Sequence, residues 1–177
     1  MRINLPVTQQ NFDFPGDELL VSSTNTKGEI THCNPAFARV SGFSYDELIG
    51  QPHNLIRHPD MPPEAYKDMW RTIGRGEPWT GLVKNRRKNG DHYWVRANVT
   101  PIMEGGKPRA YMSVRTKPSA AEISAAEALY AQMRSEAASG ASSFYLDSGN
   151  VRYRGVRGWQ QHLEQMALLP RMAILLL

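Results

Sequence analysis

The first third of the chain contains apolar segments separated by turn-forming residues, a pattern that predicts a β-hairpin. Two segments rich in apolar and β-branched residues, 19–24 and 29–33, flank the polar sequence Asn25-Thr26-Lys27-Gly28. A short polar segment that ends in glycine favours a tight turn, because glycine adopts positive φ values without steric cost. We therefore expect two antiparallel strands at this position.

Helices are predicted in the segment that follows this hairpin. Asn34 and Pro35 are typical of the first positions of a helix, and Gly42 is typical of its end. A second short helix is predicted at 45–49, and a longer one after Pro63 has apolar residues at every fourth position. The segment is therefore expected to be a connection made of several short helices.

The pattern then predicts three longer strands, at 79–86, 92–102 and 110–116. The first two are connected through Asn89-Gly90, the dipeptide that most strongly favours a two-residue hairpin. Strands thus occur in two groups with helices between them. This order indicates an α+β domain with an antiparallel sheet rather than a parallel α/β fold.

These elements divide the chain into an N-terminal arm (1–18), a central domain (19–117), a connecting helix (118–140) and a C-terminal extension (141–177). The connecting helix begins with a capping box, because Ser119 precedes Glu122 by three residues. Its apolar stripe consists of Ile123, Ala126, Leu129 (or Tyr130) and Met133. The stripe can pack on the sheet of its own chain or pair with a second copy, and the sequence leaves both alternatives open.

The C-terminal extension combines basic and apolar residues in a way that favours contact with a membrane or a partner. Apolar residues recur at helical spacing at Val156, Trp159, Leu163 and Met166, which is typical of a helix that lies on a membrane surface. The last six residues, 172–177, are all apolar and follow a segment of net positive charge. Such a run is expected to dock on a partner or to begin a membrane anchor.

Composition and charge place the chain among ordinary globular proteins. The 177 residues are 41% hydrophobic and 21% charged, and the formal net charge of +4 is too small to argue for a nucleic-acid partner. The single cysteine, Cys33, excludes an intramolecular disulfide framework. The N-terminus lacks the apolar segment of a secretory signal, so we expect a cytoplasmic protein whose C-terminus is the part that would associate with the inner membrane.

The central domain contains the sequences NPAF (34–37), SGFSYDELIG (41–50), WTG (79–81) and NRRKNGDHYWV (85–95). These sequences resemble the helical connection and the third and fourth strands of PAS domains. A narrower pair of motifs, PVTQQ (6–10) and PHNLIRHPDMP (52–62), resembles the flavin-binding PAS domain of bacterial aerotaxis receptors. The resemblance covers roughly residues 6–133.

This resemblance implies a PAS fold that encloses FAD, with a five-stranded antiparallel sheet and short helices over one face. It implies a sensor of redox state or oxygen in aerotaxis and chemotaxis signal transduction, and not an enzyme. The expected partners are a second copy of the chain and chemotaxis signalling proteins or receptor domains. The full receptors continue through a membrane anchor and a helical signalling segment without counterpart in this sequence, so we expect sensing rather than kinase control.

Four polar residues within one short segment form the main candidate site: His53, Arg57, His58 and Asp60. With the resemblance in view, we favour contact with the cofactor over a surface loop. Arg57 offers a planar fork of donors that suits a pyrophosphate or the pyrimidine carbonyls of a flavin. A permanent cation there would favour the anionic reduced flavin and raise its potential. Asp60 could accept from ribityl or ribose hydroxyls, or pair with Arg57 or His58.

Three further residues are candidates for cofactor contact. Trp79 begins a strand and is the large aromatic residue best placed to stack on an adenine or an isoalloxazine ring. The period of two along that strand places Asn85 on the same face as Trp79. The Asn85 amide can donate or accept, so it could follow a change of protonation at the flavin N5 by rotating. Asn34 is a weaker candidate, because its position is explained by helix capping.

Other interpretations of the same residues stay open. His53 or His58 could ligate haem, as in other PAS oxygen sensors. A PAS domain without a cofactor could act as a protein-interaction module. Cys33 is not interpreted as a light-sensing adduct cysteine, because it lies at the end of the second strand rather than on a later short helix.

The basic run in and after the strand at 79–86 is interpreted as a solvated surface. Lys84, Arg86 and Lys88 alternate with Val83 and Asn85, so they share the opposite face of the strand. A solvated outer face is the simpler explanation of this alternation than a nucleic-acid interface.

Overall fold

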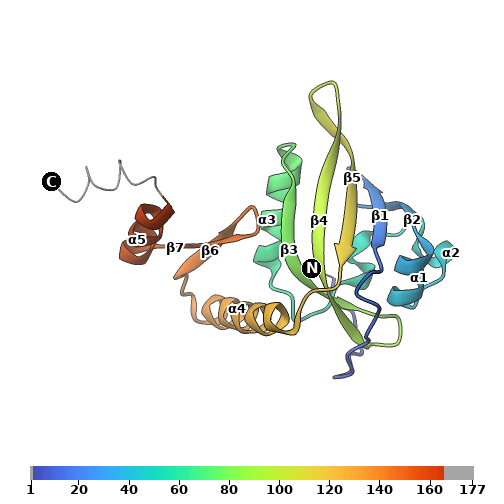
Figure 1. The fold of residues 1–177 in the computed structure, drawn as a ribbon, viewed down its shortest axis with the longest axis horizontal. Coiled ribbons are helices and arrows are strands. Elements are labelled where there is room, and N and C mark those ends of the chain that lie inside the picture. Colours follow the sequence, from blue (N-terminus) through green and yellow to red (C-terminus); the bar gives the residue numbers. More distant parts are fainter. Residues whose placement is uncertain (1, 166–177) are drawn as a thin grey trace.

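The computed structural model describes residues 2–165 and contains a five-stranded antiparallel sheet (Figure 1). Its strands are β1 (Leu20–Asn25), β2 (Ile30–Cys33), β3 (Trp79–Arg86), β4 (His92–Glu104) and β5 (Lys107–Thr116). They are arranged in the order β2-β1-β5-β4-β3, and every neighbouring pair is antiparallel. The predicted α+β class and antiparallel sheet are therefore confirmed.

Short helices connect β2 to β3 on one side of the sheet, as predicted. They are α1 (Pro35–Ser41), α2 (Tyr45–Leu48), the 3-10 helix η1 (His53–Ile56) and α3 (Pro63–Gly74). The side chain of Asn34 accepts a hydrogen bond from the amide of Phe37, and Gly42 ends α1 at a φ of 77°. Asn34 and Gly42, which the sequence marks as the ends of α1, thus act as its caps, because a polar side chain satisfies one of the first amides of this helix.

Helix α4 (Ala120–Ser139) packs on the opposite face of the sheet through the predicted apolar stripe. Ala126, Tyr130 and Met133 are buried, and the Tyr130 ring is stacked on Trp94 with centroids 6.3 Å apart. The Tyr130 hydroxyl donates to the Leu82 carbonyl at 2.5 Å. The stripe therefore covers the sheet of its own chain, the first of the two alternatives, and pairing with a second copy stays a prediction.

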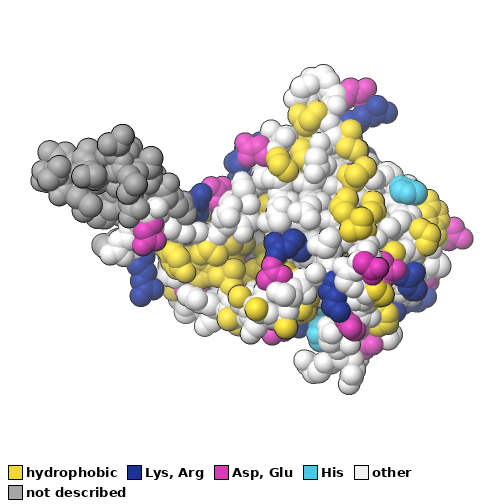
Figure 2. All heavy atoms as spheres, viewed as in Figure 1, with side chains coloured by type: hydrophobic (Ala, Val, Ile, Leu, Met, Phe, Trp, Pro, Cys, Tyr) yellow, Lys and Arg dark blue, Asp and Glu magenta, His cyan; other side chains and the backbone are white. Residues whose placement is uncertain are grey.

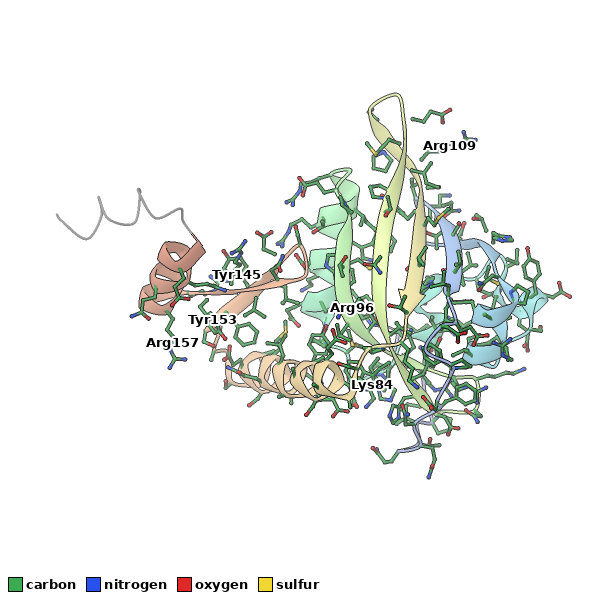
Figure 3. The ribbon with its side chains drawn as sticks, viewed as in Figure 1. Lys84, Arg96, Arg109, Tyr145, Tyr153 and Arg157 are labelled. Atoms are coloured by element: carbon green, nitrogen blue, oxygen red, sulfur yellow. The ribbon has the colours of Figure 1, made fainter. Side chains whose placement is uncertain are left out.

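The N-terminal arm lies against the end of the β3–β4 hairpin. Its backbone exchanges hydrogen bonds with Gly90 and His92, and the Pro6 carbonyl accepts from Nε of Arg86 at 2.8 Å. Lys84 is also buried, and its ammonium group lies 2.7 Å from Asp60 Oδ2. The interpretation of Lys84 and Arg86 as solvated was wrong, because the arm and α4 cover this face of β3 (Figure 3).

A second hairpin follows α4, consisting of β6 (Phe144–Asp147) and β7 (Asn150–Tyr153), and leads into α5 (Gly155–Gln165). Apolar side chains gather between α4 and this hairpin (Figure 2). Within residues 2–165, no helix combines the length and the apolar character that a bilayer span requires. The predicted apolar run 172–177, Met166 and the side chains of Val156, Trp159 and Leu163 lie outside the described part of the chain.

We expect Tyr130 to anchor α4 in two separable ways. Tyr130→Phe removes only the hydrogen bond to Leu82 and should lower the free energy of unfolding by about 0.5–1.5 kcal/mol. Tyr130→Ala also removes the stacked ring and should cost about 3–5 kcal/mol. Urea unfolding measures both values, with Tyr145→Phe on an exposed tyrosine as the matched control. Equal stability of the Tyr130→Ala variant and the parent would contradict this packing.

Candidate functional site

A cavity of about 310 Å³ lies between the helical connection and the inner face of the sheet. One wall is apolar and comes from α3, through Tyr66, Met69, Trp70 and Ile73. The opposite wall comes from the sheet, through Ser22, Thr24, Val83, Asn85, Ala97, Val99, Tyr111, Ser113 and Arg115. Residues of η1 and the loop after it, including His53 and Arg57, close one side. Clefts of this size with few polar groups are typical of small-molecule sites.

The charged residues that line this cavity are all basic: Lys27, Arg57 and Arg115. Arg115 lies at the end of β5 and is only 4% exposed. Its guanidinium donates to Ser22 Oγ at 3.0 Å and lies 2.8 Å from His53 Nε2, and no carboxylate of the described residues forms an ion pair with it. Burial lowers the pKa of Arg115 to about 10. A buried cation without an acidic partner is costly, and an anionic ligand would compensate it.

Arg57 contributes a second, half-buried cation to the cavity. Its guanidinium carbon lies 3.7 Å from the centre of the Tyr66 ring, a cation–π arrangement. The N-terminal arm holds the loop in place, because Asn4 Nδ2 donates to the carbonyls of Asn54 and Arg57 at 2.9 Å each. Burial lowers the pKa of the Arg57 guanidinium and raises the pKa of Tyr66 to about 12.

His53 is partly buried and lies between Arg115 and the ring of Phe37, whose centroid is 6.0 Å from that of the imidazole. Burial, together with the charge of Arg115, lowers the pKa of His53 to about 3. The imidazole is therefore neutral near pH 7. It can orient Arg115 without adding a further positive charge to the cavity.

Three buried polar atoms at the cavity have no hydrogen-bond partner within residues 2–165: Arg57 Nε, Asn85 Nδ2 and Ser113 Oγ. Buried polar groups of native proteins almost always have a partner, so unpartnered groups that converge on one cavity indicate a polar ligand. The predicted residues His53, Arg57 and Asn85 are thus brought together at one cavity. Contact between any of them and a cofactor stays a prediction.

Two other predicted residues, His58 and Asp60, lie on the far side of β3. Strand β3 is at the edge of the sheet, and the chain passes around that edge after Arg57, whose backbone bridges to Asn85. Asp60 then pairs with Lys84 beside a second cavity of about 300 Å³, which lies under α4. The His58 ring is buried against His92, and its Nδ1 accepts from the Asp60 amide at 3.1 Å. Neither side chain lines the first cavity.

Trp79 and Asn34 also do not line the cavity. Trp79 is buried beside α3, and its indole Nε1 donates to Asp68 Oδ2 at 2.9 Å. Asn34 is occupied by capping α1, and its Oδ1 also accepts from the Val21 amide at 3.1 Å. Both side chains therefore have partners within the protein. Neither the position of Trp79 in its strand nor the capping signal at Asn34 could distinguish such a partner from a ligand.

Sequence reasoning missed Arg115, the most buried cation of the site. Tyr111, Ser113 and Arg115 occupy alternate positions of β5 and all line the cavity. Because side chains alternate along a strand, Arg115 shares the inward face with an aromatic residue. This alternation was the available signal. It was overlooked because an arginine near the end of a strand is usually solvated.

Comparison with known proteins defines the class of this domain. Residues 30–115 match the family model described as the PAS fold, and they form a PAS domain. A light-oxygen-voltage domain studied with a flavin analogue has the same fold, with a TM-score of 0.56 and 21% identity over 67% of this chain and 89% of that chain. The dark structure of the aureochrome 1 light-oxygen-voltage domain matches with a TM-score of 0.55 and 19% identity, over 66% of this chain and 84% of that chain.

Curated proteins extend the likeness beyond the fold. The chain is 56% identical over 124 residues to the aerotaxis receptor of Escherichia coli (strain K12), which covers 70% of this chain and 24% of that receptor. It is 35% identical over 83 residues to the nitrogen fixation regulatory protein of Klebsiella pneumoniae, covering 47% of this chain and 17% of that protein. The chain thus spans about a quarter or less of the length of these two relatives.

The lowered pKa of His53 predicts a specific pH dependence of stability. Its pKa is about 3 when folded and about 6.5 when unfolded, so below pH 6.5 the unfolded chain binds a proton that the folded chain does not. This contribution is complete above pH 6.5 and is lost as pH falls toward 3. Between pH 7 and 5 it should cost about 2 kcal/mol.

His53→Gln should remove this contribution, so that its unfolding free energy falls less than that of the parent between pH 7 and 5. Denaturant titrations at both pH values measure the difference. His32→Gln, at an exposed histidine, is the control and should follow the parent. Identical pH dependence in all three proteins would contradict a lowered pKa of His53.

Proposed function

We propose that this chain is the FAD-binding redox sensor of an aerotaxis-type receptor and acts in signal transduction rather than in catalysis. The observation that carries the proposal is the buried Arg115 guanidinium, in a cavity whose charged lining residues, within residues 2–165, are all basic. A flavin with its phosphates is an anionic ligand of the kind this charge requires. The names of the similar proteins, an aerotaxis receptor and light-oxygen-voltage domains, support the same cofactor class.

The residues present fit a flavin. The two walls provide apolar surface for a planar ring, and the unpartnered Asn85 Nδ2, Ser113 Oγ and Arg57 Nε supply donors. When bound, a flavin supplies reversible uptake of electrons and protons. Arg115 and Arg57 would stabilise added negative charge in a site of low dielectric constant, because neither has a carboxylate beside it to neutralise it. These two residues therefore set the direction in which the protein shifts the potential, which is upward.

Asn85 is the residue that we propose to respond to the state of the ring. Asn85 is only 3% exposed and lies beside the Tyr93 hydroxyl, but its Nδ2 meets no acceptor within residues 2–165 at full hydrogen-bond geometry. An amide can present its oxygen as an acceptor or its nitrogen as a donor by rotating. The backbone bridge between Asn85 and Arg57 joins this residue to the loop that carries the second cation.

Haem binding is less well supported by the geometry. A haem ligand needs an imidazole nitrogen that is free, but His53 Nε2 lies 2.8 Å from Arg115. His58 lies on the far side of β3 and does not line the cavity. The receivers of the signal are proposed to be chemotaxis signalling proteins or receptor domains, with a second copy of the chain as a further partner.

Arg57→Ala should weaken FAD binding at least tenfold and leave the fold intact, because Arg57 reaches the cavity from a loop. The measurements are the FAD content of the purified protein, the dissociation constant by flavin fluorescence, and the thermal unfolding curve. Arg109→Ala is the matched control, since Arg109 is exposed beside the β4–β5 turn (Figure 3). Stoichiometric FAD in the Arg57→Ala variant would refute the role of Arg57.

Arg115→Met should retain volume but remove the buried charge. We expect the midpoint potential of the bound flavin to fall by about 30 mV or more, the equivalent of about 1.4 kcal/mol for a two-electron couple. Anaerobic dithionite titration followed by absorbance measures the potential, again with Arg109→Ala as the control. An unchanged potential would show that Arg115 does not act on the ring, and a Soret band in the parent would replace flavin by haem.

A further inference from the structure

Asp68 of α3 is a buried acid that the proposed flavin site does not use. It is 2% exposed and accepts four hydrogen bonds. Two come from side chains, Trp79 Nε1 at 2.9 Å and Arg71 Nη2 at 2.7 Å. The other two come from backbone amides, Ser148 at 2.9 Å and Gly149 at 2.7 Å. Buried carboxylates are stable only when their oxygens are satisfied in this way, so removing a donor is costly.

Both backbone donors belong to the turn of the β6–β7 hairpin. Arg71 strengthens the same attachment, because its Nη2 also donates to the Leu146 carbonyl at 2.9 Å. Gly149 has a φ of +83°, and a Cβ atom there would lie 1.9 Å from the Thr80 carbonyl oxygen. The turn is therefore seated closely against both α3 and β3, and only glycine fits at this position.

The cavity and the hairpin contact opposite faces of α3. At about 100° per residue, Tyr66, Met69, Trp70 and Ile73 fall within one arc of roughly 100°, which is the arc that lines the cavity. Asp68 lies roughly 150° from the middle of that arc, on the other side of the helix. A helix moves as one body, because its backbone hydrogen bonds join each residue to the fourth before it. A displacement of α3 as a body at the cavity wall is therefore also a displacement of Asp68.

We propose that Asp68 is the positioning residue that couples the contents of the cavity to the docking of the C-terminal hairpin. Occupancy of the cavity moves or stiffens α3, and the Ser148 and Gly149 amides respond through their bonds to Asp68. The hairpin leads directly into α5, so the change leaves the PAS domain along this path. The proposal rests on the proposed function only for the identity of the occupant, FAD.

The two amides provide a direct readout of docking. Hydrogen exchange at Ser148 and Gly149, measured by NMR or mass spectrometry with and without bound FAD, should differ at least tenfold in the parent. Asp68→Asn should raise the exchange rates and abolish this difference while the flavin content is retained. Glu64→Gln, at an exposed acid of the same helix, is the matched control and should behave as the parent.

A second variant covers the case in which Asp68→Asn does not fold. Gly149→Ala forces the turn away from Thr80 without changing the core, and it should also abolish the dependence of exchange on FAD. The proposal is overturned if exchange in the parent is the same in both states. It is also overturned if either variant keeps the parent's difference.

Failure of the proposed function can be distinguished from failure of this coupling. If the protein does not bind FAD, the proposed function fails, and the coupling is then read from the cavity wall itself. Met69→Ala, on the cavity face of α3, should change exchange at Ser148 and Gly149 at least threefold. Met112→Ala, at an exposed methionine of β5, should not. No effect of Met69→Ala would refute the coupling whatever the cofactor.

Discussion

A guanidinium group buried without a carboxylate is the constraint on which the site depends. Arg115 is held by neutral partners, Ser22 Oγ and the imidazole of His53, and its charge is not compensated within the cavity. Burial keeps His53 neutral, so the network does not add a second charge to the first. An anionic ligand in the cavity would balance the cost of this arrangement.

Helix α3 connects this site with the rest of the chain. One face forms the apolar wall of the cavity, and the opposite face carries Asp68, which binds the turn of the C-terminal hairpin. The sheet separates this cavity from a different set of contacts, in which Asp60 and Lys84 pair beneath α4. A small domain can therefore hold a cofactor on one side and attach its flanking segments on the others.

Most of the fold could be predicted from the sequence, but only part of the site. The strand at 79–86 and the helix caps at Asn34 and Ser119 follow from local signals, because alternation and capping act between neighbouring residues. Within the polar segment after Pro52, proximity in sequence wrongly predicted that all four polar residues would share one site. His53 and Arg57 face the cavity, whereas the chain turns around the edge of β3 before Asp60.

The sequence by itself determined the α+β class, the succession of strands and helices along the chain, and the resemblance to flavin-binding PAS domains. These depend on periodicity and on contiguous motifs. Only the tertiary structure decided which polar groups meet. Arg115 joins His53 from 62 residues away, and Asp68 joins Gly149 from 81 residues away. Such pairs are made by strand register and by the seating of a distant hairpin. Neither can be predicted from the local sequence, because the residues around Arg115 or Asp68 would be the same whether that side chain were solvated or buried.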